Sequence, residues 1–401
     1  AKAARPAAKS AQPAALKATA RVTPVGPGQV VSNAPGRINL IGEHTDYNGG
    51  LVLPMAIDRY TRARITERPD RHIQVHATDL NKMFTWIEGA FPLEAPSFAR
   101  YVHGAYIMLG EQFPKIKLPG YAVDITSTVP IGAGLSSSAA LSVALLQGMA
   151  QASRLPLKRD QIPALAQAIE HRFIGTKCGI MDMFVSVHAK KDHALFLDCK
   201  TLKAKPVKIS AKKVAVICAD SGIRHELADG GYNRIRQECE AAAEKLLGKP
   251  GLLRALPAKL LPLLKASQQK GPLAKLTDSE FMRVRHVMTE NERVQKTVRL
   301  MGLNKWAEVG QLFYGSHKSM RNDFRITCLE VDHLVEKAAM IDGVYGARMT
   351  GGGFGGCVVV LAEPKAAERA AEELAEDYKK TFGIILKTYR FQAAGGAFLE
   401  K

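Results

Sequence analysis

The sequence contains no apolar run that approaches the ~20 residues a membrane-spanning helix needs. The longest uncharged apolar stretch of interest, Cys357 to Ala362, has only the length of a strand. The first residues are rich in Ala, Pro and Lys and lack the apolar segment of a secretory signal. We therefore expect a cytoplasmic protein that does not contact a membrane.

Closely spaced cysteines are also missing. None of the six cysteines forms a Cys-x-x-Cys pair, and a chain of 401 residues can bury enough apolar surface to fold without disulfides. We expect reduced thiols. The length exceeds that of one ordinary compact core, which favours two domains.

Acidic residues are outnumbered, with 38 Asp and Glu against 56 Lys and Arg, a net charge of +18. The stretches 1–22 and 200–213 contain several basic residues and no acidic ones. Neither has the interleaved aromatic residues that stack on bases. We therefore expect no specific nucleic-acid partner, and a positive surface that attracts ATP is compatible with the same charge.

Low complexity marks residues 1–24 as a disordered basic tail, and we expect order to begin at Gln29. Predicted strands cover 121–129, 195–197, 214–219, 344–349, 357–361 and 385–391. Predicted helices cover 139–150, 162–174, 233–247, 279–302, 305–314, 325–339 and 364–382. Strands and helices alternate without a repeated βαβ unit, which indicates an α+β fold. The composition changes at the Lys-rich stretch, so we predict domains at 25–205 and 206–401.

The first cluster of polar residues follows an apolar strand, Ile38 to Ile41. The turn after it holds Glu43, His44, Asp46, Tyr47 and Asn48. Paired carboxylates suit the hydroxyls of a sugar, because an ionised carboxylate only accepts hydrogen bonds and a hydroxyl can donate. A plain polar hairpin is the alternative, since Asn-Gly is itself a strong turn signal.

The second cluster, Val129 to Ala140, reads as a strand, a glycine loop and the start of a helix. Backbone N–H groups at a helix N-terminus bind phosphate oxygens when no side chain blocks them. Three consecutive serines add hydroxyl donors and a possible Mg²⁺ ligand. A serine-capped helix is the alternative interpretation.

The third cluster pairs Glu170, at the edge of an apolar helical stripe, with Asp182, inside the apolar run 179–185. An acid is costly to bury unless it is paired. Asp182 is either a functional carboxylate or the N-cap of a helix over 183–187. Two carboxylates beside a serine loop would suit an oxygen-only Mg²⁺ site.

The fourth cluster has five glycines within Gly351 to Gly356. Glycines permit positive φ and close backbone approach. The segment is either a strained turn between strands or a loop that closes on a ligand.

Together, in this order and spacing, the clusters resemble the three signature motifs of the GHMP small-molecule kinases. The segment Gly36 to Asn48 looks like the signature of the galactokinases within that family, and Cys178 to Asp182 and Met349 to Cys357 also look like galactokinase segments. The resemblance covers residues 29–395. It implies two domains, ribosomal-S5-domain-2-like and ferredoxin-like, with the active site between them. It also implies phosphorylation of the anomeric hydroxyl of D-galactose, with ATP as co-substrate and Mg²⁺, as the first committed step of galactose catabolism.

The resemblance further implies residue roles by position. Asp182 and Arg37 match the catalytic pair, and the sugar-binding positions are Glu43, His44, Thr45, Asp46, Gly179, Tyr232 and Gly353. The phosphate loop comprises Gly132, Ala133, Gly134, Leu135, Ser136, Ser137 and Ser138. Ser138 and Glu170 match the metal ligands.

Two positions depart from the family pattern. Met183 stands where a Gln commonly follows the catalytic Asp, which removes a polar side chain and leaves the range of accepted sugars open. Ala77 stands where many members place a serine near the nucleotide, and the neighbouring Thr78 could replace that hydroxyl.

Two further readings of the family resemblance remain. One is a kinase for N-acetylgalactosamine, arabinose or galacturonate, and Thr45 and Asn48 favour galactose over the acetylated sugar. The other is a sugar-sensing regulator without catalysis, which the presence of the four proposed catalytic and metal residues disfavours. We expect a monomer.

Overall fold

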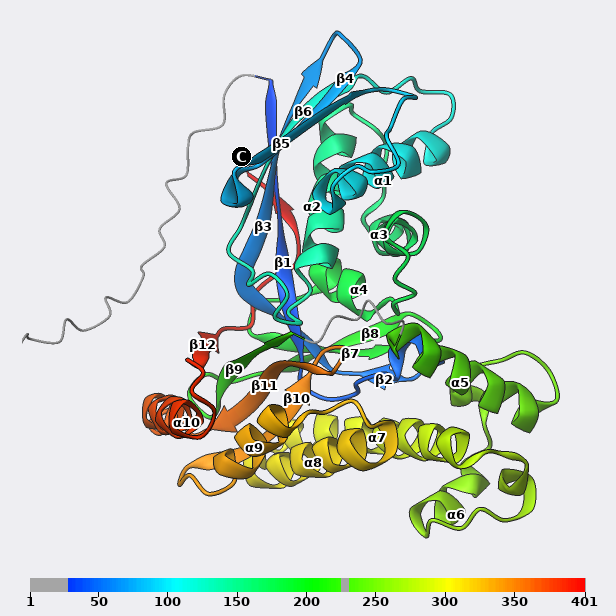
Figure 1. Cartoon of the computed structure of the whole chain (residues 1–401), viewed down its shortest axis with the longest axis vertical. Helices are drawn as coiled ribbons and strands as arrows, with labels where there is room; N and C mark the ends of the chain where they lie inside the picture. Colours follow the sequence, from blue (N-terminus) through cyan, green and yellow to red (C-terminus); the bar gives the residue numbers. More distant parts are fainter. Residues whose placement is uncertain (1–27, 225–230, 401) are drawn as a thin grey trace, which may run out of the picture.

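The computed structural model describes residues 28–224 and 231–400. The predicted basic tail, 1–24, lies outside this part of the chain. The described residues form three sheets with helices packed against them (Figure 1), and the α+β prediction is confirmed. Among the described helices, none combines the length and the apolar character needed to cross a membrane.

The first sheet has six strands in the order β13-β1-β3-β6-β4-β5. They are β1 (Gln29–Asn39), β3 (Pro54–Arg68), β4 (His72–Ala77), β5 (Lys82–Ile87), β6 (Gly120–Ser127) and β13 (Phe398–Leu399). Helices lie along one side of it (Figure 1): α1 (Ser97–Gln112), α2 (Ser137–Ala152), α3 (Ile162–Ile169) and α4 (Met181–His188). The predicted alternation in β6 is confirmed, because Tyr121, Val123 and Ile125 are buried and Asp124 is exposed.

The second sheet is antiparallel, in the order β10-β11-β9-β12. Its strands are β9 (Ala215–Arg224), β10 (Val344–Thr350), β11 (Gly355–Ala362) and β12 (Lys387–Phe391). The helices of this half are α5 (Gly231–Leu247), α6 (Leu261–Lys265), α7 (Asp278–Gly302), α8 (Trp306–Ser319), α9 (Leu329–Ala338) and α10 (Ala367–Phe382). Helix α7 starts at a capping box, in which Thr277 and Glu280 exchange side-chain and backbone hydrogen bonds of 2.8 and 3.2 Å.

The third sheet, β2-β7-β8, contains β2 (Leu51–Val52), β7 (His193–Asp198) and β8 (Lys203–Lys208). Strand β8 is an edge strand and comes from the Lys-rich stretch. Its side chains Lys203, Lys205 and Lys208 are exposed, and Pro206 removes one backbone donor. Exposed lysines and proline on an edge strand discourage pairing with another chain, which gives this charge a structural reason.

Short segments connect these elements. One-turn 3-10 helices occur at Asp46–Asn48, Thr78–Leu80, Arg159–Gln161, Leu253–Ala255, Ala258–Leu260 and Gly271–Lys275. The helix predicted at 162–174 ends as α3 at Ile169 and continues as a π-helical turn, Glu170–Ile174. The helices predicted at 305–314 and 325–339 are also wrong in their bounds. Helix α8 extends to Ser319 and a π-helical turn to Phe324, after which Arg325 has φ 54° and breaks the helix.

The last strand of the described chain belongs to the first sheet, although the segments just before it belong to the second. Strand β13 pairs with β1, and the Glu400 carboxylate accepts two hydrogen bonds from Arg62, at 2.9 and 2.8 Å, and one from Asn33 at 2.9 Å. Strand β8 ends and β9 begins on either side of residues 209–214. The division at 205/206 stays a prediction, with the qualification that β13, Phe398–Leu399, lies in the first sheet.

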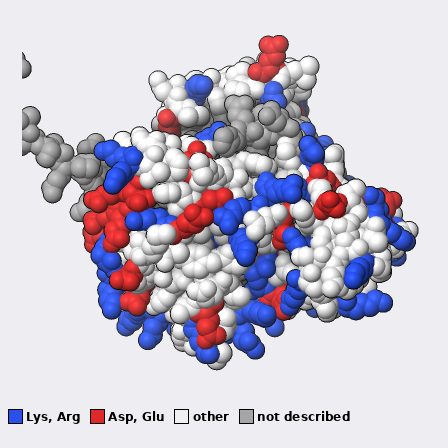
Figure 2. All heavy atoms as spheres, turned by 60° about the horizontal axis from the view of Figure 1, so that its bottom comes forward, with Lys and Arg blue, Asp and Glu red and all other residues white. Residues whose placement is uncertain are grey.

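The basic residues do not gather into one patch on the face at the bottom of Figure 1, where α7 to α9 lie. Figure 2 shows Lys and Arg interspersed there with Asp and Glu. Several form ion pairs along the helices, such as Lys296 with Glu292 and Arg321 with Glu336. This face therefore has mixed charge despite the net charge of the chain.

Candidate active site

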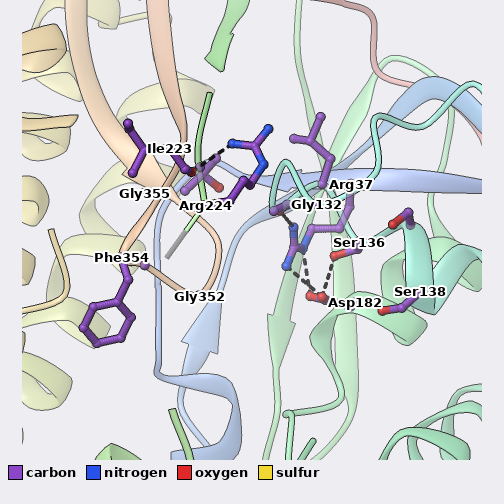
Figure 3. A pocket seen from close by; sticks show the side chains of 16 residues that line it. Arg37, Gly132, Ser136, Ser138, Asp182, Ile223, Arg224, Gly352, Phe354 and Gly355 are labelled. Atoms are coloured by element: carbon purple, nitrogen blue, oxygen red, sulfur yellow. Dashed lines mark hydrogen bonds and ion pairs between the residues drawn. The ribbon is translucent and has the colours of Figure 1, made fainter. Parts of the chain in front are cut away.

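Arg37 and Asp182 form the central ion pair of the site (Figure 3). Nε and Nη2 of Arg37 each donate to one Asp182 oxygen at 2.7 Å, and Nη1 donates to the Gly134 carbonyl at 2.6 Å. Arg37 is 5% exposed. The fork-to-fork geometry fixes both side chains, because a planar guanidinium matches a carboxylate in two hydrogen bonds.

Asp182 is not a helix cap. Helix α4 begins at Met181 and Ile180 is its N-cap, so Asp182 lies in the first turn, and the N-cap alternative is wrong. Its carboxylate also accepts a hydrogen bond of 2.5 Å from the Ser136 hydroxyl. Arg37 and Ser136 together fix the carboxylate, whose side chain remains 22% exposed.

The glycine loop before α2 lies against β1. A Cβ on Gly36 would be 2.7 Å from the Leu135 carbonyl oxygen, and that carbonyl accepts a hydrogen bond of 3.0 Å from the Arg37 amide. Ser136 has φ 60° and precedes α2 without a side-chain cap hydrogen bond. The serine-cap interpretation is therefore wrong, and the hydroxyl of Ser136 contacts Asp182 instead.

A cavity of about 410 Å³, the loop cavity, opens in front of this loop (Figure 3). It is lined by Arg37, Gly132, Gly134, Leu135, Ser136, Ser137, Ser138, Asp182, Ile223, Arg224, Thr350 and Gly352 to Gly356. Of the predicted loop residues, Ala133 alone is absent from the lining, and its side chain is buried in the core. The loop cavity thus joins the second and fourth sequence clusters.

Arg224 lies across the loop cavity from Arg37 and was not predicted. Its Nη2 donates to both oxygens of Asp220 at 2.7 Å, and Nη1 donates to the Ile223 carbonyl at 3.0 Å. Its side chain is 36% exposed. Both guanidinium groups of the cavity wall are therefore paired with carboxylates, Arg37 with Asp182 and Arg224 with Asp220. The residues around Arg224 form no motif that predicts its position, because Arg224 reaches the cavity through the pairing of β9 with a distant strand, β11.

A second cavity of about 120 Å³, the small cavity, adjoins the first. It is lined by Arg37, Glu43, His44, Asp46, Thr176, Cys178, Gly179, Met181, Asp182, Tyr232, Gly351 and Gly352. Arg37, Asp182 and Gly352 belong to both linings. The ion pair therefore lies where two ligands, one in each cavity, would meet.

Most predicted sugar-binding residues reach the small cavity, and two do not. Gly353 lines only the loop cavity. Thr45 lines neither cavity, and its buried hydroxyl lies 2.8 Å from the Gly42 carbonyl oxygen and 2.7 Å from that of Leu51. Thr45 thus braces the turn that carries the other residues.

Asp46 is packed directly against Gly179. A Cβ on Gly179 would lie 1.8 Å from Asp46 Oδ2, so only glycine leaves room for the carboxylate. Burial, and secondly the charge of Asp182, raises the pKa of Asp46 to about 6. A half-buried carboxylate in the wall of the small cavity is suited to accept hydrogen bonds from a ligand.

His44 is a neutral imidazole in a ring cluster. Burial lowers its pKa to about 3, and His286 nearby acts in the same direction. Its Nε2 lies 3.1 Å from the Gly352 carbonyl and its Nδ1 2.7 Å from the Tyr47 hydroxyl. Because a carbonyl only accepts, Nε2 carries the proton and Tyr47 donates to Nδ1. The ring centroids of Tyr232 and Phe324 lie 5.3 and 5.0 Å away.

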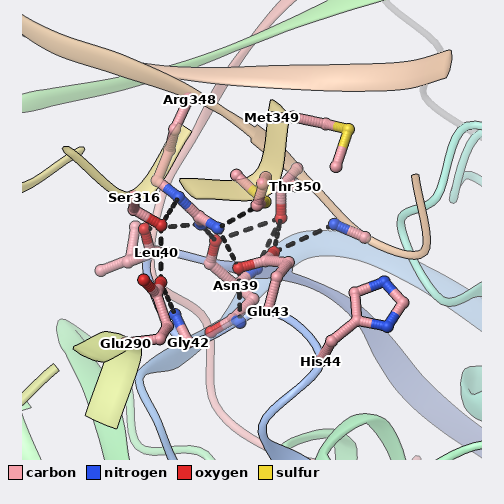
Figure 4. Close-up of polar contacts among 12 residues, drawn as sticks. Asn39, Leu40, Gly42, Glu43, His44, Glu290, Ser316, Arg348, Met349 and Thr350 are labelled. Atoms are coloured by element: carbon pink, nitrogen blue, oxygen red, sulfur yellow. Dashed lines mark hydrogen bonds and ion pairs between the residues drawn. The ribbon is translucent and has the colours of Figure 1, made fainter. Parts of the chain in front are cut away.

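Glu43 belongs to a buried polar network (Figure 4). Its carboxylate forms an ion pair with Arg348 and accepts from the Asn39 amide at 2.9 Å, the Thr350 hydroxyl at 3.0 Å and the Gly351 N–H at 3.0 Å. Burial raises the pKa of Glu43, while Arg348 and the Gly351 N–H oppose the rise. The network connects the signature turn with the glycine-rich turn.

Glu170 lies beside the start of α2. The Tyr101 hydroxyl is 3.2 and 3.3 Å from its two oxygens, and Ser138 also forms a hydrogen bond with it. Burial raises the pKa of Glu170, and no cation is among the groups that act on it. A buried carboxylate and a hydroxyl without a cation offer the oxygen ligands that Mg²⁺ prefers. Among the described residues no cluster of three His, Cys, Asp or Glu forms a metal site.

A third cavity of about 450 Å³, the side cavity, shares Ser137 and Ser138 with the loop cavity. Apolar side chains and one phenol dominate its wall: Ala77, Leu80, Phe98, Tyr101, Ile125, Ile131 and Leu141. Ala77 lies in this lining, whereas Thr78 does not, and the implied position of Ala77 near the nucleotide stays a prediction. Tyr101 was missed, because α1 was not predicted. The spacing of Ala99, Val102, Tyr106 and Leu109, all buried, could have revealed that helix.

Met183 does not reach either the loop cavity or the small cavity. It is 1% exposed and packs in the core between α4 and the first sheet. Met183 therefore contributes to the core and not to either cavity wall, while the nearby Met181 lines the small cavity.

Comparisons with known proteins bear on these cavities. Family models match three segments: the galactokinase galactose-binding signature at residues 24–66, the GHMP kinase N-terminal domain at 100–190 and the GHMP kinase C-terminal domain at 297–380. The chain is 38% identical to the galactokinase of Pasteurella multocida over 366 residues, covering 90% of this chain and 93% of that protein. It is also 38% identical to human galactokinase over 388 residues, with 92% of each covered.

Solved structures show the same relationship. Lactococcus lactis galactokinase complexed with galactose superposes with a TM-score of 0.84 at 28% identity, covering 92% of this chain and 95% of that one. A mevalonate kinase superposes with a TM-score of 0.64 at 19% identity, covering 90% and 98%. The second match shows a shared fold.

Proposed function

The chain belongs to the galactokinase family of the GHMP kinases, and from that premise we propose that it transfers a phosphoryl group from ATP to the anomeric hydroxyl of D-galactose. The product is galactose 1-phosphate, the first committed intermediate of galactose breakdown. The observation that carries the proposal is the position of Arg37 and Asp182 in the walls of both cavities. A sugar in one cavity and a phosphate in the other would meet at this pair.

We propose that the small cavity binds the sugar. A volume of about 120 Å³ is below the range of about 300–1,000 Å³ typical of pockets for drug-sized ligands, so it suits a single small ring. Asp46 offers a carboxylate to the sugar hydroxyls, and Tyr232 offers an apolar face. Glu43 and His44 line the same cavity and hold its wall in place through their hydrogen bonds to Gly351 and Gly352. Gly179 keeps Asp46 in place, and Thr45 holds the turn.

ATP would occupy the other two cavities. Backbone N–H groups of Gly132 to Ser138, at the N-terminus of α2, would bind phosphate oxygens, with Arg37 and Arg224 on the flanks. The side cavity, continuous with the loop through Ser137 and Ser138, would take the purine. Gly353 would place backbone rather than a side chain against the phosphates.

In the chemical step, the oxygen of the anomeric hydroxyl would bond to the terminal phosphorus of ATP while Asp182 accepts the proton of that hydroxyl. The bond between that phosphorus and the bridging oxygen of ADP breaks, and ADP leaves. Arg37 would orient Asp182 and stabilise the charge on the transferring group, since phosphoryl transfer depends on positioning and electrostatics. Bound between Ser138 and Glu170, Mg²⁺ would neutralise charge on the phosphate oxygens.

We further propose a cytoplasmic monomer without a nucleic-acid partner. The six cysteines are free, which agrees with a reducing compartment.

A panel of sugars tests the proposal. ATP consumption is measured with galactose, 2-deoxygalactose, talose, N-acetylgalactosamine and arabinose. We expect galactose to be the best substrate. A preference for N-acetylgalactosamine or arabinose would instead favour a related sugar kinase, and binding of galactose without turnover would favour a sensor. No turnover of any sugar would refute the proposal.

A single substitution tests the role of Asp182. Asp182→Asn keeps the size of the side chain and removes the proton acceptor, so we expect turnover to fall by about 10²–10⁴-fold with binding of an ATP analogue retained. Asp160→Asn is the matched control, because that carboxylate is 91% exposed and lines neither cavity of the reaction. Near-normal turnover of Asp182→Asn would exclude Asp182 as the base.

A further inference from the structure

Arg348 is the largest fully buried side chain among the described residues, with 0% exposure. It lies on β10, two residues before Thr350, and lines neither the loop cavity nor the small cavity. A fully buried guanidinium is costly unless each of its donors is satisfied. Its contacts therefore show what this position requires.

Every nitrogen of Arg348 has an oxygen partner in the network of Figure 4. Nε donates to the Ser316 hydroxyl at 3.1 Å, and Nη1 donates to the carbonyls of Asn39 and Leu40 at 3.1 and 2.9 Å. Nη2 forms the ion pair with Glu43. Arg348 thus holds the end of β1 and the Glu43 side chain at the same time.

A second carboxylate supports this arrangement from α7. Glu290 accepts from the Gly42 amide at 3.1 Å, from Ser316 at 2.5 Å and from Arg293 at 2.6 Å. Through Ser316, Glu290 and Arg348 clamp the signature turn immediately before Glu43. Two guanidinium groups and two carboxylates balance in charge within this buried set.

The effect of Arg348 on the small cavity passes through Glu43. The remaining donors to that carboxylate are the Asn39 amide, the Thr350 hydroxyl and the Gly351 N–H. Glu43 and Gly351 both line the small cavity. The orientation of Glu43 and the position of the glycine-rich turn are therefore fixed together by one residue that neither ligand touches.

We propose that Arg348 is a positioning residue for the sugar: it sets the orientation of Glu43 and, through Glu43, the place of Gly351 in the wall of the small cavity. This inference rests on the proposed function. Arg348→Lys keeps the positive charge and removes the fork that serves Asn39, Leu40, Ser316 and Glu43 together. We expect KM for galactose to rise about 10- to 100-fold, the effect of losing a hydrogen bond to a charged group, while KM for ATP changes less than about twofold.

A double-mutant cycle distinguishes positioning from mere stability. If Arg348 acts through Glu43, adding Arg348→Lys to Glu43→Gln raises KM for galactose little beyond the effect of Glu43→Gln alone. Multiplicative effects of the two substitutions would overturn the proposal, as would equal rises in KM for galactose and ATP. Arg285→Lys is the matched control, because Arg285 pairs with Asp323 and lines neither cavity, so its KM values should stay within about twofold.

A milder variant, Ser316→Ala, tests the proposal if Arg348→Lys does not fold. If Arg348→Lys is not recovered as folded protein, Ser316→Ala removes the partner of Nε and is expected to raise KM for galactose selectively, again with little further effect in the Glu43→Gln background. An unchanged KM in Ser316→Ala would then overturn the proposal. The wild-type assay separates the two hypotheses: no galactose turnover by the wild type refutes the proposed function, whereas normal turnover with a multiplicative cycle refutes only the role of Arg348.

Discussion

The contact between Gly179 and Asp46 permits a prediction with a magnitude. In Gly179→Ala the new Cβ would lie 1.8 Å from Oδ2, 2.2 Å from Cγ and 2.8 Å from Oδ1 of Asp46. Real Cβ contacts essentially never fall below 3.0 Å, so the carboxylate must move by about 1.2 Å. The φ of Gly179 is not in the positive region, so alanine is tolerated by the backbone and the perturbation is purely steric.

A displacement of this size is large for a binding group. A misplacement of about 1 Å in a substrate-positioning group can cost about 10²-fold in rate, which corresponds to about 2.7 kcal/mol in kcat/KM. We expect kcat/KM for galactose to fall by about this factor, mainly through KM. The loop cavity and its serines lie elsewhere, so KM for ATP should change little.

The assay is steady-state kinetics with galactose and ATP varied separately, together with thermal unfolding. Gly395→Ala is the matched control, because its Cβ would meet nothing within 4 Å and its φ is not positive. If Gly179→Ala keeps KM for galactose within about twofold of the wild type, the close approach of Asp46 to this backbone does not exist in solution, and the reasoning fails.

Two further predictions concern charged groups. Because the pKa of Asp46 is raised to about 6, its carboxyl becomes protonated as the pH falls through 6 and one of its two oxygens becomes a donor, so the affinity for galactose measured by calorimetry should fall below that pH. This limb should vanish in Asp46→Asn, and its persistence there would assign it to another group. Glu170→Gln should lower kcat/KM by about 10²-fold or more and weaken the Mg²⁺ dependence of ATP-analogue binding. Binding with the wild-type Mg²⁺ dependence would show that Glu170 is not a ligand.

The sequence contained much of the site because its parts are local motifs. The composition around Gly132 to Ser138 predicts a strand, a glycine loop and a helix. The density of polar groups around Glu43 and Asp46 predicts a binding turn. Both lie in the walls of cavities in the structure. Asp182 was found by the physical cost of an acid in an apolar run, and it forms the expected kind of pairing with Arg37.

The residues that were missed depend on contacts between distant segments. Arg224 reaches the loop cavity through the pairing of β9 with β11, and Arg348 meets Glu43 across 305 positions of sequence. Arg348 shares with Asp182 the feature of a charge among uncharged residues, since it lies in a predicted strand whose other residues carry no charge. Its partner could not have been named, because nothing local relates β10 to the end of β1.

The bounds of the helices were harder to predict from the sequence than their presence. The two π-helical turns that the structure describes begin at Glu170 and Met320, extend the preceding helices and end at residues with positive φ, Gly175 and Arg325. Such turns often occur at functional positions, and Glu170 is one of the proposed metal ligands. Met183, by contrast, departs from the family pattern beside Asp182, yet its side chain lies in the core and not in the site.

The pairing of β13 with β1 has a consequence for how the protein is made. Strand β1 precedes β13 in the sequence, so one edge of β1 is completed only after residues 398–400 are synthesised and Glu400 contacts Arg62 and Asn33. Until then the nascent chain presents an unpaired strand edge that other chains can bind. The first sheet therefore cannot close during translation of its own segment, and a fusion or cleavage that disturbs Glu400 would prolong the aggregation-prone interval.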